Sequence, residues 1–175
     1  MACCPPPPHP LRDMVMVALT TGMRRGEILG LKWDYVRLES RFIILPIIKN
    51  NTSRVVPINE TLYRILAEMP QKSGYVFGNG NGGDIGDIKH SFTSACRKAG
   101  ITDFRFHDLR HTYASHLAMR GVHIRALQEL LGHKTLAMTQ RYSHLAPGQL
   151  QNAVKLLDGV IGEGRDLVGR VTQYD

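Results

Sequence analysis

The feature that most constrains the fold is a set of polar side chains in the last third of the chain, spread over successive helical segments. His107 and Arg110 are three residues apart, so they point the same way on a helix. His133 and Tyr142 follow on later short segments. A cation, a proton-transfer group and a hydroxyl nucleophile together suit an anionic, phosphate-like target. We therefore expect a fold that brings these segments to one surface.

Two earlier segments offer further cations. Arg24 comes two residues after Gly22, and Glu27 follows it by one helical turn. Lys49 begins the turn-forming run 49–53 between two strand-like segments, so we expect it near the tip of a hairpin. Taken singly, such residues are more often exposed charges or weak surface ion pairs. Their joint order along the chain is what indicates a site.

Composition favours one globular domain with a polyanionic partner. The chain has 175 residues, of which 43% are hydrophobic and 21% charged, which are ordinary globular values. Its net charge of +7 favours a phosphate-rich partner, because Lys and Arg release counterions when they neutralise phosphates. No apolar run approaches membrane-spanning length, and Pro5–Pro8 lie where a secretory signal needs apolar residues. Three cysteines do not make a disulfide framework, so we expect a cytoplasmic location.

The hydrophobic pattern predicts an α+β, mainly α-helical domain with a small antiparallel sheet. Strands are expected at 42–45, 54–58 and 75–77, and Pro46 is expected to restrict the first strand to an edge or bulge position. Apolar stripes and breaks predict helices at 10–22, 24–31, 60–69, 85–99, 107–120, 124–131, a short one capped by Thr135 that carries Tyr142, and 149–157.

Domain boundaries follow from the same pattern. Residues 1–9 are expected to be a proline-rich linker or a cloning remnant, because they have no way to bury themselves. Residues 10–158 are expected to form the single domain. Residues 159–175 are glycine-rich and are expected to be a flexible tail.

Phosphodiester transfer explains why such residue types would gather. A tyrosine hydroxyl can hold a phosphoryl group covalently, and its phenolate leaves more readily than an alkoxide, so the step can reverse. Arginines can clamp the extra negative charge of the transition state, and losing one such donor costs on the order of 100- to 1,000-fold in rate. The departing oxygen needs a proton, and a positioned acid is worth roughly 100- to 10,000-fold.

In this order and spacing the motifs resemble the catalytic domain of tyrosine recombinases, the phage integrase family, over about residues 11–157. The resemblance implies the tyrosine-recombinase catalytic fold, a small antiparallel sheet packed on a helical bundle. It implies that Tyr142 is the nucleophile and that Arg24 and Arg110 clamp the phosphate. It implies that His107 transfers a proton and that Lys49 protonates the leaving oxygen.

His133 matches the histidine that hydrogen-bonds the phosphate, and Glu27 matches the acid that supports the site. The resemblance implies a tyrosine-type site-specific DNA recombinase that acts through a 3′-phosphotyrosyl intermediate, without metal, ATP or another cofactor. Its implied partner is double-stranded DNA, with no membrane partner, and its implied assembly is a homotetramer on two DNA sites. Such enzymes usually carry an N-terminal DNA-clamping domain, so we expect a catalytic-domain fragment or truncated gene that could by itself be a monomer.

Other functions remain open at this point. Type IB topoisomerases use the same chemistry, so strand relaxation without exchange is one alternative. The chain could also be a DNA-binding module that is catalytically idle without a clamp domain. Whether the helix at 149–157 docks on a neighbour or packs on its own domain is equally open.

Two other patterns imitate nucleotide or metal sites. Residues 78–83 fit G-x-G-x-x-G, but no strand–helix–strand unit with a spaced acid accompanies them, so we interpret them as a surface loop. Asp84 and Asp87 lie one turn apart, but metal-dependent nucleases need clustered carboxylates for two ions. Asp84 is more simply interpreted as a helix N-cap.

The histidines at 107, 111 and 116 also raise the question of zinc, because a four-residue spacing can hold that metal. Arg110 lies between the first two and opposes a dication, so no metal site is predicted. We expect His111 to pack inside or to bond a backbone carbonyl, and His116 to be structural or exposed.

Overall fold

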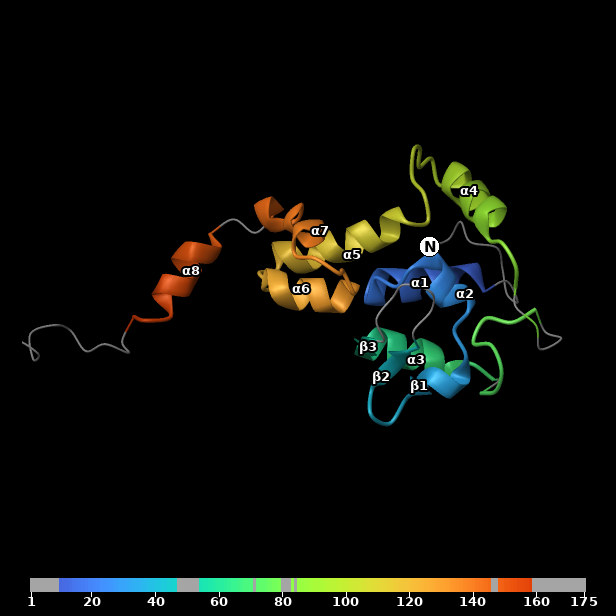
Figure 1. The fold of residues 1–175 in the computed structure, drawn as a ribbon. Helices are drawn as coiled ribbons and strands as arrows, with labels where there is room; N and C mark the ends of the chain where they lie inside the picture. The colour runs from blue at the N-terminus through green and yellow to red at the C-terminus, as the bar shows by residue number, and fades with distance from the viewer. Residues whose placement is uncertain are drawn as a thin grey trace, which may run out of the picture.

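The computed structural model describes residues 10–46, 54–70, 72–79, 83, 85–145 and 148–158. Figure 1 shows a helix-rich molecule with a small three-stranded antiparallel sheet at one side, which confirms the expected α+β class. Within these ranges, no helix is both long enough and apolar enough to cross a membrane. Lys49, Asp84 and residues 80–82 of the 78–83 loop lie outside the described residues.

The first N-terminal helix forms as the sequence predicts, and the second is shorter than the expected 24–31. Helix α1 spans Leu11–Thr21 and buries an apolar stripe, and it ends at Gly22, whose φ of 63° is the left-handed conformation that glycine adopts most readily. A Cβ on Gly22 would lie 2.5 Å from the ring of Tyr113, so this residue also allows a close approach between α1 and a later helix. Helix α2 spans Arg25–Leu29, which places Arg24 at its N-cap.

The sheet has the order β1-β2-β3, with β1 at Val36–Arg37, β2 at Phe42–Leu45 and β3 at Arg54–Pro57. The expectation that Pro46 keeps its strand at an edge is wrong, because β2 is the central strand. Pro46 follows the last paired residue of β2 and so removes no hydrogen bond from the ladder. Strand β1 and the 3₁₀ helix η1, Trp33–Tyr35, were not predicted, since two- and three-residue elements leave no periodicity.

Two expectations for the middle of the chain need correction. Helix α3 covers Glu60–Glu68 much as predicted. The strand expected at 75–77 is only an isolated bridge between Tyr75 and Lys32. Helix α4 runs Lys89–Lys98 and starts four residues late, because Gly86 takes a φ of 73° and the Asp87 carboxylate accepts the Lys89 amide.

The C-terminal part carries the polar motifs. Helix α5 spans Asp108–Met119, α6 spans Ile124–Leu131, α7 spans Ala137–Gln140, the 3₁₀ helix η2 spans Ser143–Leu145, and α8 spans Gln149–Lys155. Tyr142 lies in the turn after α7 and not on the helix, and Thr135 is not the cap, because α7 begins after Leu136 without a side-chain cap. Figure 1 shows α8 apart from the other elements.

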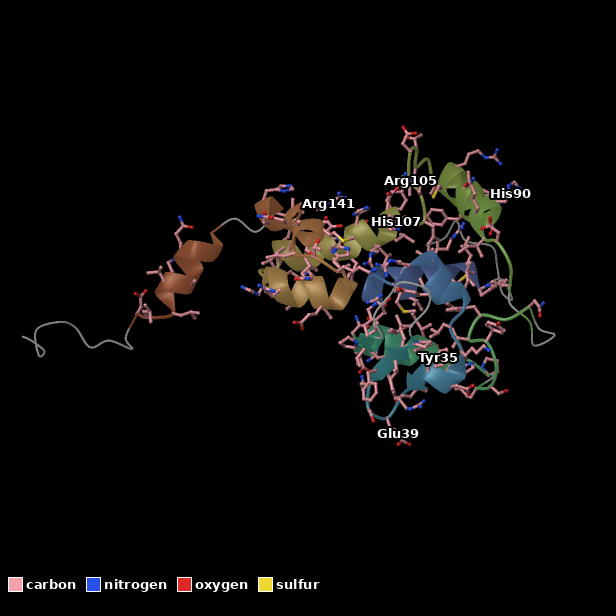
Figure 2. All side chains as sticks on the ribbon, in the orientation of Figure 1. Tyr35, Glu39, His90, Arg105, His107 and Arg141 are labelled. Carbon is pink, nitrogen blue, oxygen red and sulfur yellow. The ribbon has the colours of Figure 1, made fainter. Side chains whose placement is uncertain are left out.

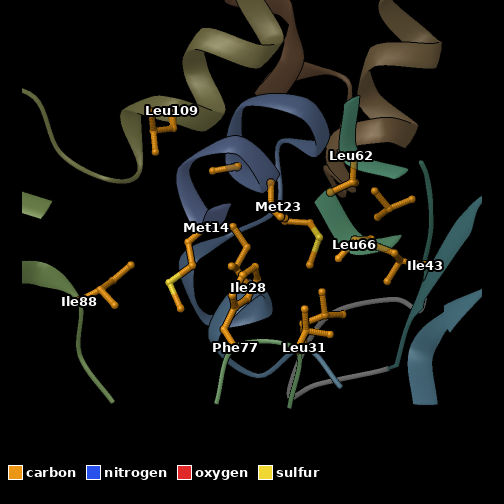
Figure 3. Close-up of a cluster of buried hydrophobic side chains, with 14 of the residues drawn as sticks. Met14, Met23, Ile28, Leu31, Ile43, Leu62, Leu66, Phe77, Ile88 and Leu109 are labelled. Carbon is orange, nitrogen blue, oxygen red and sulfur yellow. The ribbon is translucent and has the colours of Figure 1, made fainter. Parts of the chain in front are cut away.

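The core has two parts. The larger cluster lies between α1, α2, α3 and the sheet, where Met14, Met23, Ile28, Leu62 and Leu66 pack together (Figure 3). The smaller cluster joins α5 and α6 and includes the ring of Tyr142. Helix α5 packs along α1 and connects the two clusters. This packing fixes the C-terminal motifs against the N-terminal arginine segment.

Candidate active site

One pocket of about 210 Å³ collects the predicted residues. It is lined by Arg24, His107, Arg110, His111, His133, Met138, Arg141 and Tyr142. Figure 2 shows two of these on the same side of the molecule, His107 at the start of α5 and Arg141 after α7. Of the six residues expected to be catalytic, five line this pocket, and the sixth, Lys49, lies outside the described residues. A larger hollow of about 640 Å³ between β3 and α6 shares only His133 with it.

Three arginines from distant segments converge on the C-terminal end of α6. Arg54 donates to the carbonyl of Leu130, Arg110 donates to that of Leu131, and Arg24 lies 3.5 Å from that of Gly132. The last carbonyls of a helix have no intrahelical partner and carry partial negative charge, so they attract cations. The end of α6 therefore positions three guanidinium groups beside one another.

Gly132 makes this convergence sterically possible. Its φ of 61° ends α6 in the left-handed conformation. A Cβ at this position would lie 2.5 Å from Cδ of Arg54 and would displace that side chain. The Leu-Gly-His motif thus requires its glycine for two reasons, backbone conformation and space.

Arg110 is the most buried of the pocket's cations. Its Nη1 donates to the carbonyl of Gly22 at 2.5 Å. Arg110 therefore contacts the C-terminal end of α1 as well as that of α6. Burial, followed by the charges of Arg24 and Arg54, lowers the pKa of Arg110 to about 10. The group stays charged at neutral pH, and two helix ends fix its orientation.

Glu27 is the acid that supports these arginines. Its carboxylate accepts the backbone N–H of Arg24 at 2.7 Å, Nη1 of Arg24 at 2.9 Å and Nη2 of Arg54 at 2.8 Å. Burial raises the pKa of Glu27, but the Arg54 charge and the Arg24 N–H outweigh it, so the pKa lies below its usual value. Glu27 is therefore ionised and links α2 to β3.

Arg54 is a site residue that the sequence analysis missed. Its side chain is only 9% exposed, and it bridges Glu27 and the carbonyl of Leu130. Arg54 begins β3, so it ties the base of the hairpin to the end of α6. A charged residue that opens an otherwise apolar strand was the available signal.

His133 lies at the pocket as a neutral ring. Its Nδ1 is 2.9 Å from the hydroxyl of Thr139, whose side chain is buried. Burial and then the charges of Arg110 and Arg24 lower the pKa of His133 to about 4. If Thr139 donates to Nδ1, the neutral ring carries its proton on Nε2 and can donate it to an anion.

Tyr142 is buried, and its hydroxyl has a specific partner. Its Oη lies 2.5 Å from Nδ1 of His111. The expectation that His111 packs inside or bonds a backbone carbonyl is therefore wrong. His111 lies one helical turn beyond His107 on α5, so its place on the polar face was the signal that could have found it. Burial raises the pKa of the Tyr142 phenol, against the lowering effect of Arg141 and Arg110.

Comparisons with known proteins address the family directly. The family model described as the Phage integrase family matches residues 1–149, most of the chain. The chain belongs to the phage integrase family. The tyrosine recombinase family suggested by the motifs is thereby confirmed.

Similar proteins support the same family and fold. The integrase of Salmonella phage P22 is 34% identical over 170 residues, which cover 88% of this chain and 44% of that protein. The catalytic domain of bacteriophage HP1 integrase matches with a TM-score of 0.71 and 35% identity, covering 88% of this chain and 86% of that domain. XerH site-specific recombinase, solved in a post-cleavage complex with difH substrate, matches with a TM-score of 0.66 and 25% identity, covering 84% and 45%. The chain thus spans less than half of the P22 integrase.

The pocket of this phage integrase family member has a consistent electrostatic character. Burial and neighbouring cations lower the pKa of His107 and of His111 below the usual 6.5. The ring of His107 stands edge-on to that of His111, with centroids 5.1 Å apart. Among the described residues, no three His, Cys, Asp or Glu side chains are grouped to hold a metal ion. Burial is the larger cause of each lowered pKa, and the smaller part that comes from positive charge is what an anion in the pocket would offset.

Proposed function

We propose that this chain is the catalytic domain of a tyrosine-type site-specific DNA recombinase, an integrase. The observation that carries the proposal is the position of the Tyr142 hydroxyl in a pocket that Arg24, Arg110 and His133 also line. Tyr142 would attack a DNA phosphate to give a 3′-phosphotyrosyl intermediate and a free 5′ hydroxyl. A 5′ hydroxyl from a second strand would then attack the intermediate and release Tyr142.

The proposed roles follow from the contacts. Arg24 and Arg110 bind the non-bridging oxygens, because their guanidinium groups keep N–H donors beyond those bonded to carbonyls. His133 donates a hydrogen bond as a neutral ring, and His107 transfers a proton at the phosphate. Preorganised donors of this kind stabilise charge that develops in the transition state without reorganising during the reaction.

Lys49 is proposed as the acid that protonates the leaving 5′ oxygen. Strands β2 and β3 lie on either side of its segment, and Arg54 at the start of β3 contacts the end of α6. The base of the hairpin is therefore tied to the pocket. Lys49 lies between these strands in the sequence, and the proposal is that it reaches the bound phosphate from there.

The proposed partner is double-stranded DNA, and the proposed assembly is a homotetramer on two DNA sites. The net charge of +7 and the cation-lined pocket support the DNA partner. The exposed side chains of Val154 and Leu156, at the end of α8 and just after it, support docking of this helix on a neighbouring protomer. We also propose residues 10–158 as the domain and the cytoplasm as its location.

A metal-free covalent capture assay tests this function. The full chain is incubated in EDTA with a random-sequence duplex library that carries a nick near its centre, and adducts that survive SDS are recovered. Wild-type protein is expected to give adducts, and Tyr142→Phe none, while the control Tyr63→Phe behaves as wild type because Tyr63 lies on α3 against Arg41.

Each alternative gives a different result. Adducts from Tyr142→Phe would show that another residue is the nucleophile. Reversible binding without adducts would favour a DNA-binding module. Relaxation of supercoiled DNA without strand exchange would favour a topoisomerase.

A further inference from the structure

The hydroxyl of Tyr142 has one hydrogen-bond partner among the described residues, Nδ1 of His111 at 2.5 Å. The two rings are tilted by 43°, with centroids 6.1 Å apart, so the contact is made edge to edge through polar atoms. His107 makes no hydrogen bond to this hydroxyl in the described part of the chain, although its ring lies beside His111. Within the part of the chain that the structure describes, the nucleophile therefore meets one basic nitrogen, that of His111.

Both side chains are held in place by the fold. His111 is on the second turn of α5, which packs along α1, and the ring of Tyr142 belongs to the cluster between α5 and α6. Tyr142 lies in the turn after α7. Two backbone hydrogen bonds fix this turn, because Tyr142 N–H donates to the carbonyl of Thr139 and Leu145 N–H donates to that of Tyr142. A fixed hydrogen bond of this length is the geometry that proton transfer requires.

Burial, together with the charges around it, keeps His111 neutral and able to accept a proton. On its own helix and the preceding turn it faces His107, Asp108, Arg110 and Arg105, and from the segment after α7 it faces Arg141. Burial, then Arg141, lowers the pKa of His111, while Asp108 opposes them. A neutral imidazole whose Nδ1 faces a phenol can act as the acceptor.

We propose that His111, and not His107, is the catalytic base that deprotonates Tyr142. This role rests on the proposed function, and it moves the proton transfer assigned there to His107 onto His111. As Oη of Tyr142 forms its bond to phosphorus, its proton passes to Nδ1 of His111. The bond from phosphorus to the 5′ oxygen breaks, and that oxygen takes a proton from the acid named above. In the reverse step His111 returns its proton to Tyr142, so the residue ends each cycle neutral.

The hydrogen bond itself is tested without DNA. In ¹⁵N-histidine-labelled protein, long-range NMR spectra at about pH 7 are expected to show His111 unprotonated at Nδ1 and protonated at Nε2. The variant Tyr142→Phe should shift the Nδ1 resonance of His111 and leave that of His116, which is exposed on α5, unchanged. A protonated Nδ1 would make His111 a donor and would overturn the proposal.

The catalytic role is tested by the pH profile of adduct formation on a duplex recovered in the capture assay. Wild-type rates should be flat from about pH 7 to 9, since His111 is already neutral there, and should fall as the pH drops through its lowered pKa. In His111→Ala the phenol must ionise first, so the rate at about pH 7 should fall by roughly 100-fold or more and rise about tenfold per pH unit. Added imidazole should restore part of it.

Two further variants separate proton transfer from structure. His111→Asn keeps an acceptor oxygen close to the position of Nδ1 but is not basic, so it should be as slow as His111→Ala. His116→Ala removes an exposed histidine from the same helix and should match wild type. Full activity of His111→Asn would show that the residue only orients Tyr142, and full activity of His111→Ala would show that it has neither role. If wild-type protein forms no adduct, the proposed function fails as a whole, whereas these variant results concern His111 alone.

Discussion

Replacing Glu27 by Gln should destabilise the domain strongly, because Glu27 is the buried counter-charge of the arginine cluster. The side chain of Glu27 is 10% exposed and that of its partner Arg54 is 9% exposed, so water screens the pair little. Gln keeps one acceptor oxygen but places an N–H₂ group against guanidinium donors. Arg54 then keeps the carbonyl of Leu130 but loses its anion.

The magnitude follows from this geometry. Breaking a buried ion pair from one side costs about 3–5 kcal/mol, because a buried charge is left uncompensated. The lower end applies here, about 3 kcal/mol, since Arg54 keeps a carbonyl partner and Arg24 is one-third exposed. In a domain of this size that loss lowers Tm by roughly 6–12 °C.

Urea unfolding of wild type and Glu27→Gln at about pH 7 measures the difference. The control is Glu60→Gln, which removes an exposed carboxylate that also accepts from two arginines, Arg41 and Arg64, and should change stability little. Adding Arg54→Met to Glu27→Gln should recover part of the loss, because the buried charge that Glu27→Gln leaves unpaired at Arg54 is then removed. Equal effects of Glu27→Gln and Glu60→Gln would refute the argument from burial.

The same pair predicts a pH dependence. The pKa of Glu27 is lower in the folded protein than its ordinary 4.5, so its contribution is complete above that pH and is lost as the pH falls through the folded pKa. The stability gap between wild type and Glu27→Gln should therefore shrink on acidification below about 4.5. A gap that stays constant to lower pH would contradict the stated charge state.

Three shorter predictions concern the pocket. Gly132→Ala should destabilise the domain more than Gly100→Ala in urea unfolding, because both have positive φ but only a Cβ at Gly132 meets Arg54; equal losses would contradict this. In NMR titration, the free protein should keep His133 neutral down to about pH 5, since its pKa is about 4, and a normal pKa would argue against the clustered cations. Arg110→Lys should slow adduct formation on the order of 100-fold or more, because an ammonium cannot serve two carbonyls and a phosphate as a guanidinium does, and wild-type rates would refute that reasoning.

Apolar spacing and helix-stop residues predicted the helices whose bounds depend on local sequence. The stripe of α1 and its stop at Gly22 were visible because apolar spacing and a left-handed glycine act within one turn. Helix α6 was predicted with the bounds that the structure shows. The start of α4 was missed because Gly86 and Asp87 determine it by backbone conformation and a side-chain hydrogen bond, which periodicity does not show.

The residues of the site divide in the same way, into those that sequence motifs predicted and those that only the folded structure shows. The motif order predicted five residues that the structure places at one pocket, and the packing of α5 on α1 and on α6 brings their segments together. Arg54 and His111 were missed because their roles depend on partners 76 and 31 positions away, Leu130 and Tyr142. Contacts of that separation come from tertiary packing, so helical spacing and residue type could mark His111 and Arg54 as candidates but could not identify their partners.

The identity of the nucleophile can be measured on the covalent adduct itself. After nuclease trimming and trypsin digestion, the nucleotide-bearing peptide is sequenced by mass spectrometry. Residues 142–155 form one tryptic peptide, in which Tyr142 is the only tyrosine. We predict a nucleotide attached through a phosphate to Tyr142. The same mass on any other residue, or a wild-type protein that yields no modified peptide while it binds DNA, would contradict the account.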